Sequence, residues 1–191
     1  MDTRTLAFIV SGVVVLIVIA ALLAMRKHKS AQLKEHFGPE YDRVAQEQGD
    51  ARHAEAVLSQ REKRVEKLSI HPLPGFQREG YLQEWMAVQR RFVDDPSAAV
   101  TEADSLVTAV MTARGYPMSD FEQRAADISV NYPTVVHNYR SAREIVLRHA
   151  KGHSSTEDLR QAIVCYRSLF EELLDSPKPV KTGVSHERIA S

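Results

Sequence analysis

The sequence contains one cysteine, Cys165, among its 191 residues, so the chain cannot form an internal disulfide. A reducing cytosol suits such a chain, although a single thiol demands no particular compartment. Net charge is missing too, because 25 basic residues balance 25 acidic ones. The global basicity that usually accompanies nucleic-acid binding is therefore absent, and we expect no nucleic acid among the partners.

Motifs of the familiar enzyme classes are also missing. The eight glycines stand singly, so they form neither the GxGxxG nor the GxxxxGK[ST] loop that holds nucleotide phosphates. There is no GxSxG nucleophile elbow, and Cys165 lies between apolar neighbours in AIVCYR, which indicates a packed thiol. The sequence predicts no catalytic residue, no cofactor and no enzyme activity.

Eight histidines raise the question of metal binding, but they are scattered along the chain. Only His149 and His153 have the four-residue separation of a helical ligand pair, and Gly152 between them is expected to end the helix. Basic residues before that glycine fit a helix C-terminus, where cations are favoured. We predict no metal site.

Two groups of carboxylates are candidates for acid–base chemistry. They are Asp94–Asp95 and the run Asp120, Glu122 and Asp127 around Arg124. Both groups lie where helices are expected to begin, and carboxylates at these positions accept hydrogen bonds from free backbone N–H groups. Helix capping therefore accounts for most of them.

The longest apolar run is LAFIVSGVVVLIVIAALLAM, residues 6–25, which contains no charged residue. As a helix rising about 1.5 Å per residue, such a run covers the roughly 30 Å of a bilayer's hydrocarbon core. Its thirteen Leu, Ile, Val and Phe residues, at about −0.3 to −0.6 kcal/mol each, favour insertion by on the order of 4 to 8 kcal/mol. The run predicts a transmembrane helix.

A cleaved signal peptide is the alternative, because small residues stand near the end of this run. However, the run is longer than the about 7 to 15 residues of a signal peptide's apolar region, and Arg26, Lys27 and Lys29 follow at once like a stop-transfer flank. Basic residues are more numerous after the run than before it, so the positive-inside rule places the C-terminal part in the cytoplasm. We predict an anchor at residues 1–29 in the lipid bilayer, with the N-terminus outside.

A juxtamembrane stalk, residues 30–75, is expected after the anchor. Helical periodicity with Gly and Pro at the joints predicts short helices divided at Gly38-Pro39 and Gly49-Asp50. The last of them carries a thin apolar seam, narrower than a core-facing stripe. The seam consists of Ala51, Ala54, Leu58, Val65 and Leu68. Two prolines in HPLPG, residues 71–75, end the stalk.

A compact bundle is expected at residues 76–175. Asp95 and Pro96 suit the N-cap and first turn of a helix, and Ser119-Glu122 and Ser155-Asp158 read as capping boxes. Pro133 is expected to break the third helix of the bundle. Apolar stripes mark its first helix (Tyr81, Leu82, Trp85, Met86, Phe92, Val93) and its last (Leu159, Ile163, Tyr166, Leu169, Phe170, Leu173).

The predicted fold class is therefore all-α, with an N-terminal transmembrane helix, a helical stalk and a small four- to five-helix bundle. Residues 176–191 contain two prolines and few apolar side chains, so we expect a disordered tail. Within the bundle, a helix carrying Glu102 and Asp104 without cations precedes a basic helix carrying Arg140 and Arg143. These complementary faces could dock on each other within the domain, which we favour, or meet a partner.

Four stretches carry a family resemblance. They are FGPEYDR (37–43), RFVDDP (91–96), GYPMSDFEQRAADISV (115–130) and STEDLRQAIVCYRSLFEELL (155–174). Together they resemble an uncharacterised bacterial family of single-pass membrane proteins, often labelled hypothetical or secreted proteins. The resemblance covers nearly the whole chain beyond the anchor. It implies a bacterial envelope setting and brings no activity, cofactor or functional residue with it.

Three functional hypotheses follow. The first is a membrane-anchored adaptor or scaffold that binds another protein, or itself through the stalk seam. The second is a small-molecule sensor or enzyme with a pocket inside the bundle. The third is an extracytoplasmic domain behind a cleaved signal peptide. Candidate interaction residues are Trp85, Arg90, Arg91, Asp120, Arg124, Asp127 and Tyr139, and the membrane-flank cations are Arg26, Lys27 and Lys29.

Overall fold

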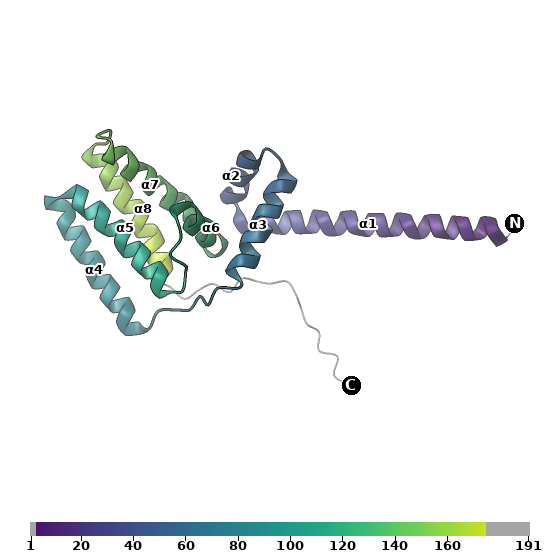
Figure 1. The fold of residues 1–191 in the computed structure, drawn as a ribbon, viewed down its shortest axis with the longest axis horizontal. Coiled ribbons are helices and arrows are strands. Elements are labelled where there is room, and N and C mark those ends of the chain that lie inside the picture. The colour runs from purple at the N-terminus through teal and green to yellow at the C-terminus, as the bar shows by residue number, and fades with distance from the viewer. Residues whose placement is uncertain (1–2, 175–191) are drawn as a thin grey trace. The chain divides into compact units, whose positions relative to one another are not determined.

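A computed structural model describes residues 3–174, except for the side chains of residues 3–11 and 13–15. This part of the chain forms eight α-helices and no strand, which confirms the predicted all-α fold (Figure 1). The helices are α1 (Thr3–Phe37), α2 (Pro39–Gln48), α3 (Ala51–Val65), α4 (Gly75–Asp94), α5 (Pro96–Ala113), α6 (Phe121–Asn131), α7 (Val136–Ala150) and α8 (Thr156–Leu174). The expected tail at residues 176–191 lies outside the described residues.

The predicted anchor, residues 6–25, falls within α1, which is continuous over 35 residues. The side chains of residues 6–11 and 13–15 lie outside the described ones, so much of the apolar run does too. Among the described residues, no helix combines the length and the apolar character that a membrane crossing requires. The transmembrane helix stays a prediction from the sequence.

The chain divides into two compact units, Met1–Ser59 and Gln60–Ser191, and the division falls inside α3. In the first unit, Gly38 (φ 49°) follows α1 and Gly49 (φ 67°) follows α2, and both have the positive φ that favours glycine; Gly49 is in the left-handed conformation that ends a helix. Hydrogen bonds then join the three helices, because Ser30 of α1 and Tyr41 of α2 both donate to Glu55 Oε1 of α3, at 2.5 and 3.1 Å.

The apolar seam of the stalk is buried rather than exposed. Ala54 and Leu58 have no accessible surface, and Val65 retains 4%. These residues of the seam, which motivated the idea of self-association, are therefore not open to a second chain. The reason is that the chain supplies its own apolar cover: Phe37 and Val44 are buried in the same unit as Ala54 and Leu58.

The second unit is the predicted bundle. Within it α4 packs on α5, α5 on α8 and α8 on α7, so the four longest helices follow the spatial order α4, α5, α8, α7 (Figure 1). α6 is a short helix that contacts α7. The expected break near Pro133 is confirmed, because α6 ends at Asn131 and α7 begins at Val136.

The apolar stripes predict the core well for α8 and less well for α4. In α8, Leu159, Ile163 and Tyr166 and the rest of the stripe are all buried. In α4, only Trp85 and Val88 are buried, while Met86 and Val93 are 40% and 82% exposed. The prediction is wrong for Met86 and Val93, because α4 lies at one end of the helix order and offers only one face to neighbours.

The helix starts depend on side-chain caps. The Asp95 carboxylate accepts from the Ala98 N–H at the start of α5, and Ser155 and Asp158 form the predicted capping box at α8. The box predicted at Ser119 is wrong, because Asp120, one residue later, caps α6 by accepting from the Gln123 N–H. A carboxylate next to a serine competes for the same N-cap role.

A buried arginine closes the lower end of the bundle. Arg114 follows α5 and has no accessible surface; its Nη1 donates to the Tyr132 hydroxyl at 2.5 Å and to the Leu173 carbonyl at 2.7 Å. Gly115 comes next at φ 94°, where a Cβ would stand 2.4 Å from the Ser69 carbonyl oxygen. These contacts hold the ends of α5, α6 and α8 and the segment before α4 together.

Candidate functional site

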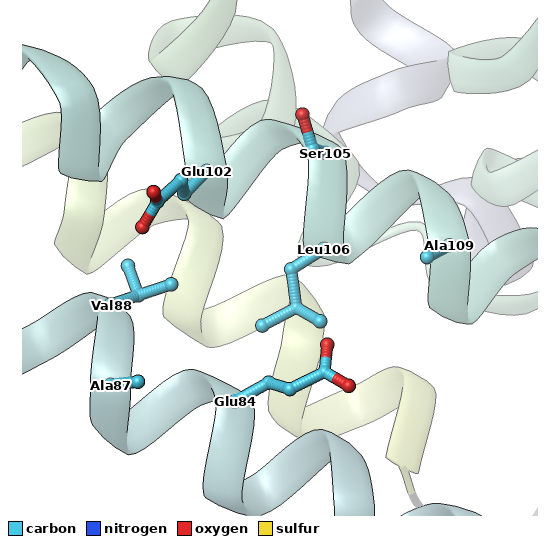
Figure 2. A pocket seen from close by; sticks show the side chains of 7 residues that line it. All are labelled: Glu84, Ala87, Val88, Glu102, Ser105, Leu106 and Ala109. Carbon is cyan, nitrogen blue, oxygen red and sulfur yellow. The ribbon is translucent and has the colours of Figure 1, made fainter.

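An open groove runs between α4 and α5, with a volume of about 380 Å³. Its lining residues are Glu84, Ala87 and Val88 of α4, and Glu102, Ser105, Leu106 and Ala109 of α5. Figure 2 shows Val88 and Leu106 between the two helices, with the carboxylates of Glu84 and Glu102 on either side of them. The groove is therefore an apolar floor between two acidic groups.

The shape of this groove follows from side-chain size. Val88 and Leu106 are buried and fill the seam between α4 and α5. Beside them, Ala87, Ser105 and Ala109 are exposed, and their short side chains cannot cover the seam. An open depression remains where longer side chains would have closed the surface. Small residues of this kind let a further helix approach closely.

The charge of the groove is negative, because no Lys or Arg is among its lining residues. Glu102 forms an ion pair with Arg91, whose Nη1 lies 2.6 Å from Glu102 Oε1. The side chains of Glu102 and Arg91 are 41% and 55% exposed, so solvent screens this pair. Glu84 makes no ion pair with any described residue. At least one carboxylate is thus available to a cation from outside.

The sequence-predicted interaction residues do not form one group. Trp85 stacks on Phe170 with ring centroids 4.7 Å apart, and Arg91 pairs with Glu102. These residues and the exposed Arg90 belong to α4, at one end of the helix order. Asp120, Arg124, Asp127 and Tyr139 belong to the α6 and α7 end. Only Arg91 contacts the groove, through Glu102.

At the α6 and α7 end, Tyr139 lies fully buried among aromatic rings, with centroids 4.7 Å from Phe121 and 6.3 Å from Tyr166. Burial raises the pKa of Tyr139 to about 12, against a smaller lowering by Arg124. The Tyr166 hydroxyl donates to Asp104 at 2.9 Å, and burial raises its pKa as well. Both phenols are therefore neutral, and of the two the Tyr166 hydroxyl is the one that donates to a described partner.

Asp127 is the most enclosed carboxylate of the candidate residues, at 1% exposure. Its Oδ1 accepts a hydrogen bond from Gln123 Nε2 at 2.9 Å and forms an ion pair with Arg64 Nε at 3.1 Å. Burial raises the pKa of Asp127, and the charges of Arg64 and Arg61 lower it less. This carboxylate holds the end of α3 against α6 and has little surface to offer to a ligand.

The prediction that the acidic helix α5 docks on the basic helix α7 is wrong, because the charged residues of these two helices pair with other helices. Glu102 meets Arg91 of α4, and Arg140 of α7 meets Glu122 of α6 at 2.6 Å. Asp104 accepts from an uncharged phenol. The helix order separates α5 from α7 by α8, so their charges find partners on nearer helices.

Sequence reasoning did not single out the groove itself. Its signal is the outer face of α5, where Ser105 and Ala109 recur at helical spacing beside the acidic Glu102. The pattern in α5 does not reveal a groove unless the position of α4 beside it is known. No family model matches the chain, and no match to a curated protein or a solved structure is found.

Proposed function

We propose that this protein is a membrane-anchored helical adaptor whose α4/α5 groove binds a cationic helical segment of another protein. The observation that carries the proposal is the groove, an open apolar floor between Glu84 and Glu102. Helices commonly dock on other proteins by laying an apolar face into such a groove. Lys or Arg beside that face complements the two carboxylates and steers the encounter.

Small side chains favour a helix as the bound element. Packed helix axes lie about 8 to 10 Å apart, and the shorter distances need small residues at the contact. Ala87, Ser105 and Ala109 provide them on the rim of the groove. The apolar contacts with Val88 and Leu106 supply affinity, while the exposed carboxylates supply selection for charge.

The proposed location is the bacterial cytoplasmic membrane, with the N-terminus outside and the bundle in the cytoplasm. The apolar run at residues 6–25 supports the anchor, and Arg26, Lys27 and Lys29 support its orientation. In this arrangement the same cations lie at the anionic headgroups of the inner leaflet. The resemblance to single-pass bacterial membrane proteins is in keeping with this setting.

Protease protection tests the location. A tag after Ser191 should resist protease in intact cells and become sensitive in inside-out vesicles. N-terminal sequencing of the purified chain should find Met1 or Asp2, whereas a new N-terminus near Met25 means that a signal peptide has been cleaved. Exposure of the tag on the outer side of intact cells contradicts both the orientation and the cytoplasmic adaptor.

Site-specific cross-linking in cells tests the groove. A photo-cross-linking amino acid at Ser105 should yield a defined protein adduct, whereas the same group at Arg167, an exposed position on α8, should not. The double change Glu84→Lys with Glu102→Lys should abolish the Ser105 adduct by repelling a cationic partner. Equal adducts at both positions, or an adduct that survives the double change, count against the groove.

Self-association through the stalk is a weaker arrangement of the same adaptor. Its motive was the apolar seam, and Ala54 and Leu58 within that seam are buried inside the chain. A dimer that used them would first have to open the first unit. Light scattering of the detergent-solubilised chain should therefore give a monomer at micromolar concentration.

A second candidate function is binding of a small polar ligand between α6 and α7. Tyr139 Oη and Arg124 Nε are both enclosed without a hydrogen-bond partner within 3.5 Å among the described residues. Buried polar groups of this kind are costly, which makes them candidates for ligand contacts. A ligand that raises the melting temperature of the wild type and has no effect on Tyr139→Phe would support this function over the adaptor.

A further inference from the structure

The groove between α4 and α5 has an acidic lining that complements a cation. Glu84 has no ion pair with a described residue, and the only ionic partner described for Glu102 is the solvent-exposed Arg91. No cationic side chain lines the floor. A segment that carries Lys beside small or apolar residues therefore complements the groove in both charge and size.

The chain itself contains such a segment after α8. Residues 176–186 read SPKPVKTGVSH, with Lys178 and Lys181 and no carboxylate. Val180 lies between the two lysines and supplies one apolar side chain for the floor. Pro177 and Pro179 restrict the backbone before binding, which lowers the entropy that binding removes.

The segment starts close enough to reach the groove. Arg114, directly after α5, donates to the Leu173 carbonyl, so the end of α8 lies beside the end of α5. Glu102 is eleven residues before Ala113, or about 17 Å along the helix axis. Seven extended residues carry the chain from Leu174 to Lys181 over at most about 23 Å. Along the axis of α5, this reach exceeds the distance from the end of the helix to Glu102.

We propose that residues 177–186 bind the α4/α5 groove of the same chain and compete there with the partner protein. This inference rests on the proposed function, because it assigns the groove two alternative occupants. Exposed ion pairs are individually weak, so the tether is essential to the interaction. A short tether supplies an effective concentration in the millimolar range, which populates even a weak complex. Partner binding then requires displacement of the segment, and higher salt weakens the ion pairs of both occupants.

Paramagnetic relaxation in the full-length chain, held in detergent micelles or nanodiscs, tests the proposal. A nitroxide is attached at Ser185→Cys in a Cys165→Ala background, and amide signals of Ala87, Ser105 and Ala109 are followed. We expect a roughly twofold or greater loss of intensity at these amides, because the tether keeps the nitroxide near the groove whenever the segment is bound. Amides of Lys151 and Gly152, at the opposite end of the bundle from Leu174, should keep their intensity.

Three controls decide the result. The loss should disappear in Lys178→Gln with Lys181→Gln and in Glu84→Gln with Glu102→Gln, whose spectra also report whether the fold is retained. The loss should also be absent in a mixture of two chains. One chain carries the nitroxide but no isotope label, and the other carries the isotope label but no nitroxide. No loss at the groove, loss that survives the Gln variants, or loss in the mixed sample would each overturn binding within one chain.

The two proposals fail separately. If the Ser105 cross-link to a partner persists and the groove amides show no relaxation effect, the segment is not an occupant and the adaptor stands. If the relaxation effect is present and no partner cross-links even after Lys178 and Lys181 are changed to Gln, the groove serves the segment alone and the adaptor falls.

Discussion

The α6/α7/α8 side of the bundle encloses its polar and apolar groups, whereas the α4/α5 side leaves many of them exposed to solvent. On the α6/α7/α8 side, α8 buries nine residues, and the polar groups Asp127 and Tyr166 are enclosed with partners. On the α4/α5 side, α4 buries only Trp85 and Val88, and its carboxylates face solvent across an open groove. The first side therefore holds the fold together, and the second leaves a surface for binding.

The position of each helix explains this difference. α8 packs between α5 and α7, so most of its circumference meets protein. α4 is last in the order and packs mainly on α5. A helix of 20 residues with two buried side chains contributes less to the core than one of 19 residues with nine. Substitutions on the two sides should accordingly change the free energy of unfolding by different amounts and, at some positions, in opposite directions.

The largest contrast is expected between two aliphatic side chains. Leu169→Ala on α8 removes a side chain with no accessible surface and should lower the free energy of unfolding by about 2 to 5 kcal/mol. Val93→Ala on α4, at 82% exposure, should change it by no more than about 0.5 kcal/mol. Urea unfolding followed by the fluorescence of Trp85, the only tryptophan, measures both. Equal losses would remove the distinction between the two sides.

The next contrast concerns hydrogen bonds to carboxylates. Tyr166→Phe leaves Asp104 without the buried phenol and should cost about 1 to 3 kcal/mol. Glu102→Gln breaks only the solvent-screened pair with Arg91 and should cost about 0 to 1 kcal/mol. The same urea titrations separate the two values. A larger cost for Glu102→Gln would mean that the groove side contributes to stability through its charges.

The sequence predicts the helices better than their arrangement. Asp95 and Pro96, the box of Ser155 and Asp158, and the break at Pro133 mark helix ends by local chemistry, and the structure bears them out. These signals act within a few residues of chain, so no knowledge of neighbours is needed.

The groove escaped prediction because it depends on which helices are neighbours. Trp85 and Tyr139 are both candidate interaction residues, but α5 and α8 lie between their helices in the packing order. Likewise Ser105 and Ala109 form a rim only because α4 packs beside α5. Periodicity identifies the apolar face of a helix and carries no information on the order in which helices pack.

A smaller contrast, of opposite sign, is expected at two glycines. Gly80→Ala in the middle of α4 meets no atom within 4 Å of the new Cβ and should stabilise the chain by about 0.5 to 1 kcal/mol. Gly152→Ala after α7 also has open space, but φ is +74° there, so it should destabilise by about 1 to 2 kcal/mol. Denaturant midpoints of the two variants give the signs directly. Stabilisation at Gly152 would show that the left-handed turn is dispensable.

The smallest expected effect is a change in the pH dependence of stability at Asp127. Burial raises the pKa of this carboxyl above its ordinary value, so the folded state favours the protonated form. Its contribution to stability is full below about pH 4 and is lost as the pH rises through the folded pKa. Asp127→Asn cannot titrate, so the variant should gain stability relative to the wild type over that rise.

Asp158 provides the control with the opposite sign. Hydrogen bonds from Ser155 lower the pKa of its exposed carboxyl, so its contribution is present above the ordinary pKa and is lost as the pH falls. Asp158→Asn should therefore lose stability relative to the wild type as the pH rises through about 4. The other charges near Asp127 are Arg61, Arg64 and Asp120, and all three remain in both variants. If Asp127→Asn also lost stability relative to the wild type as the pH rises, the attraction of Arg61 and Arg64 would outweigh burial. The α6/α7/α8 side would then hold Asp127 as a paired ion.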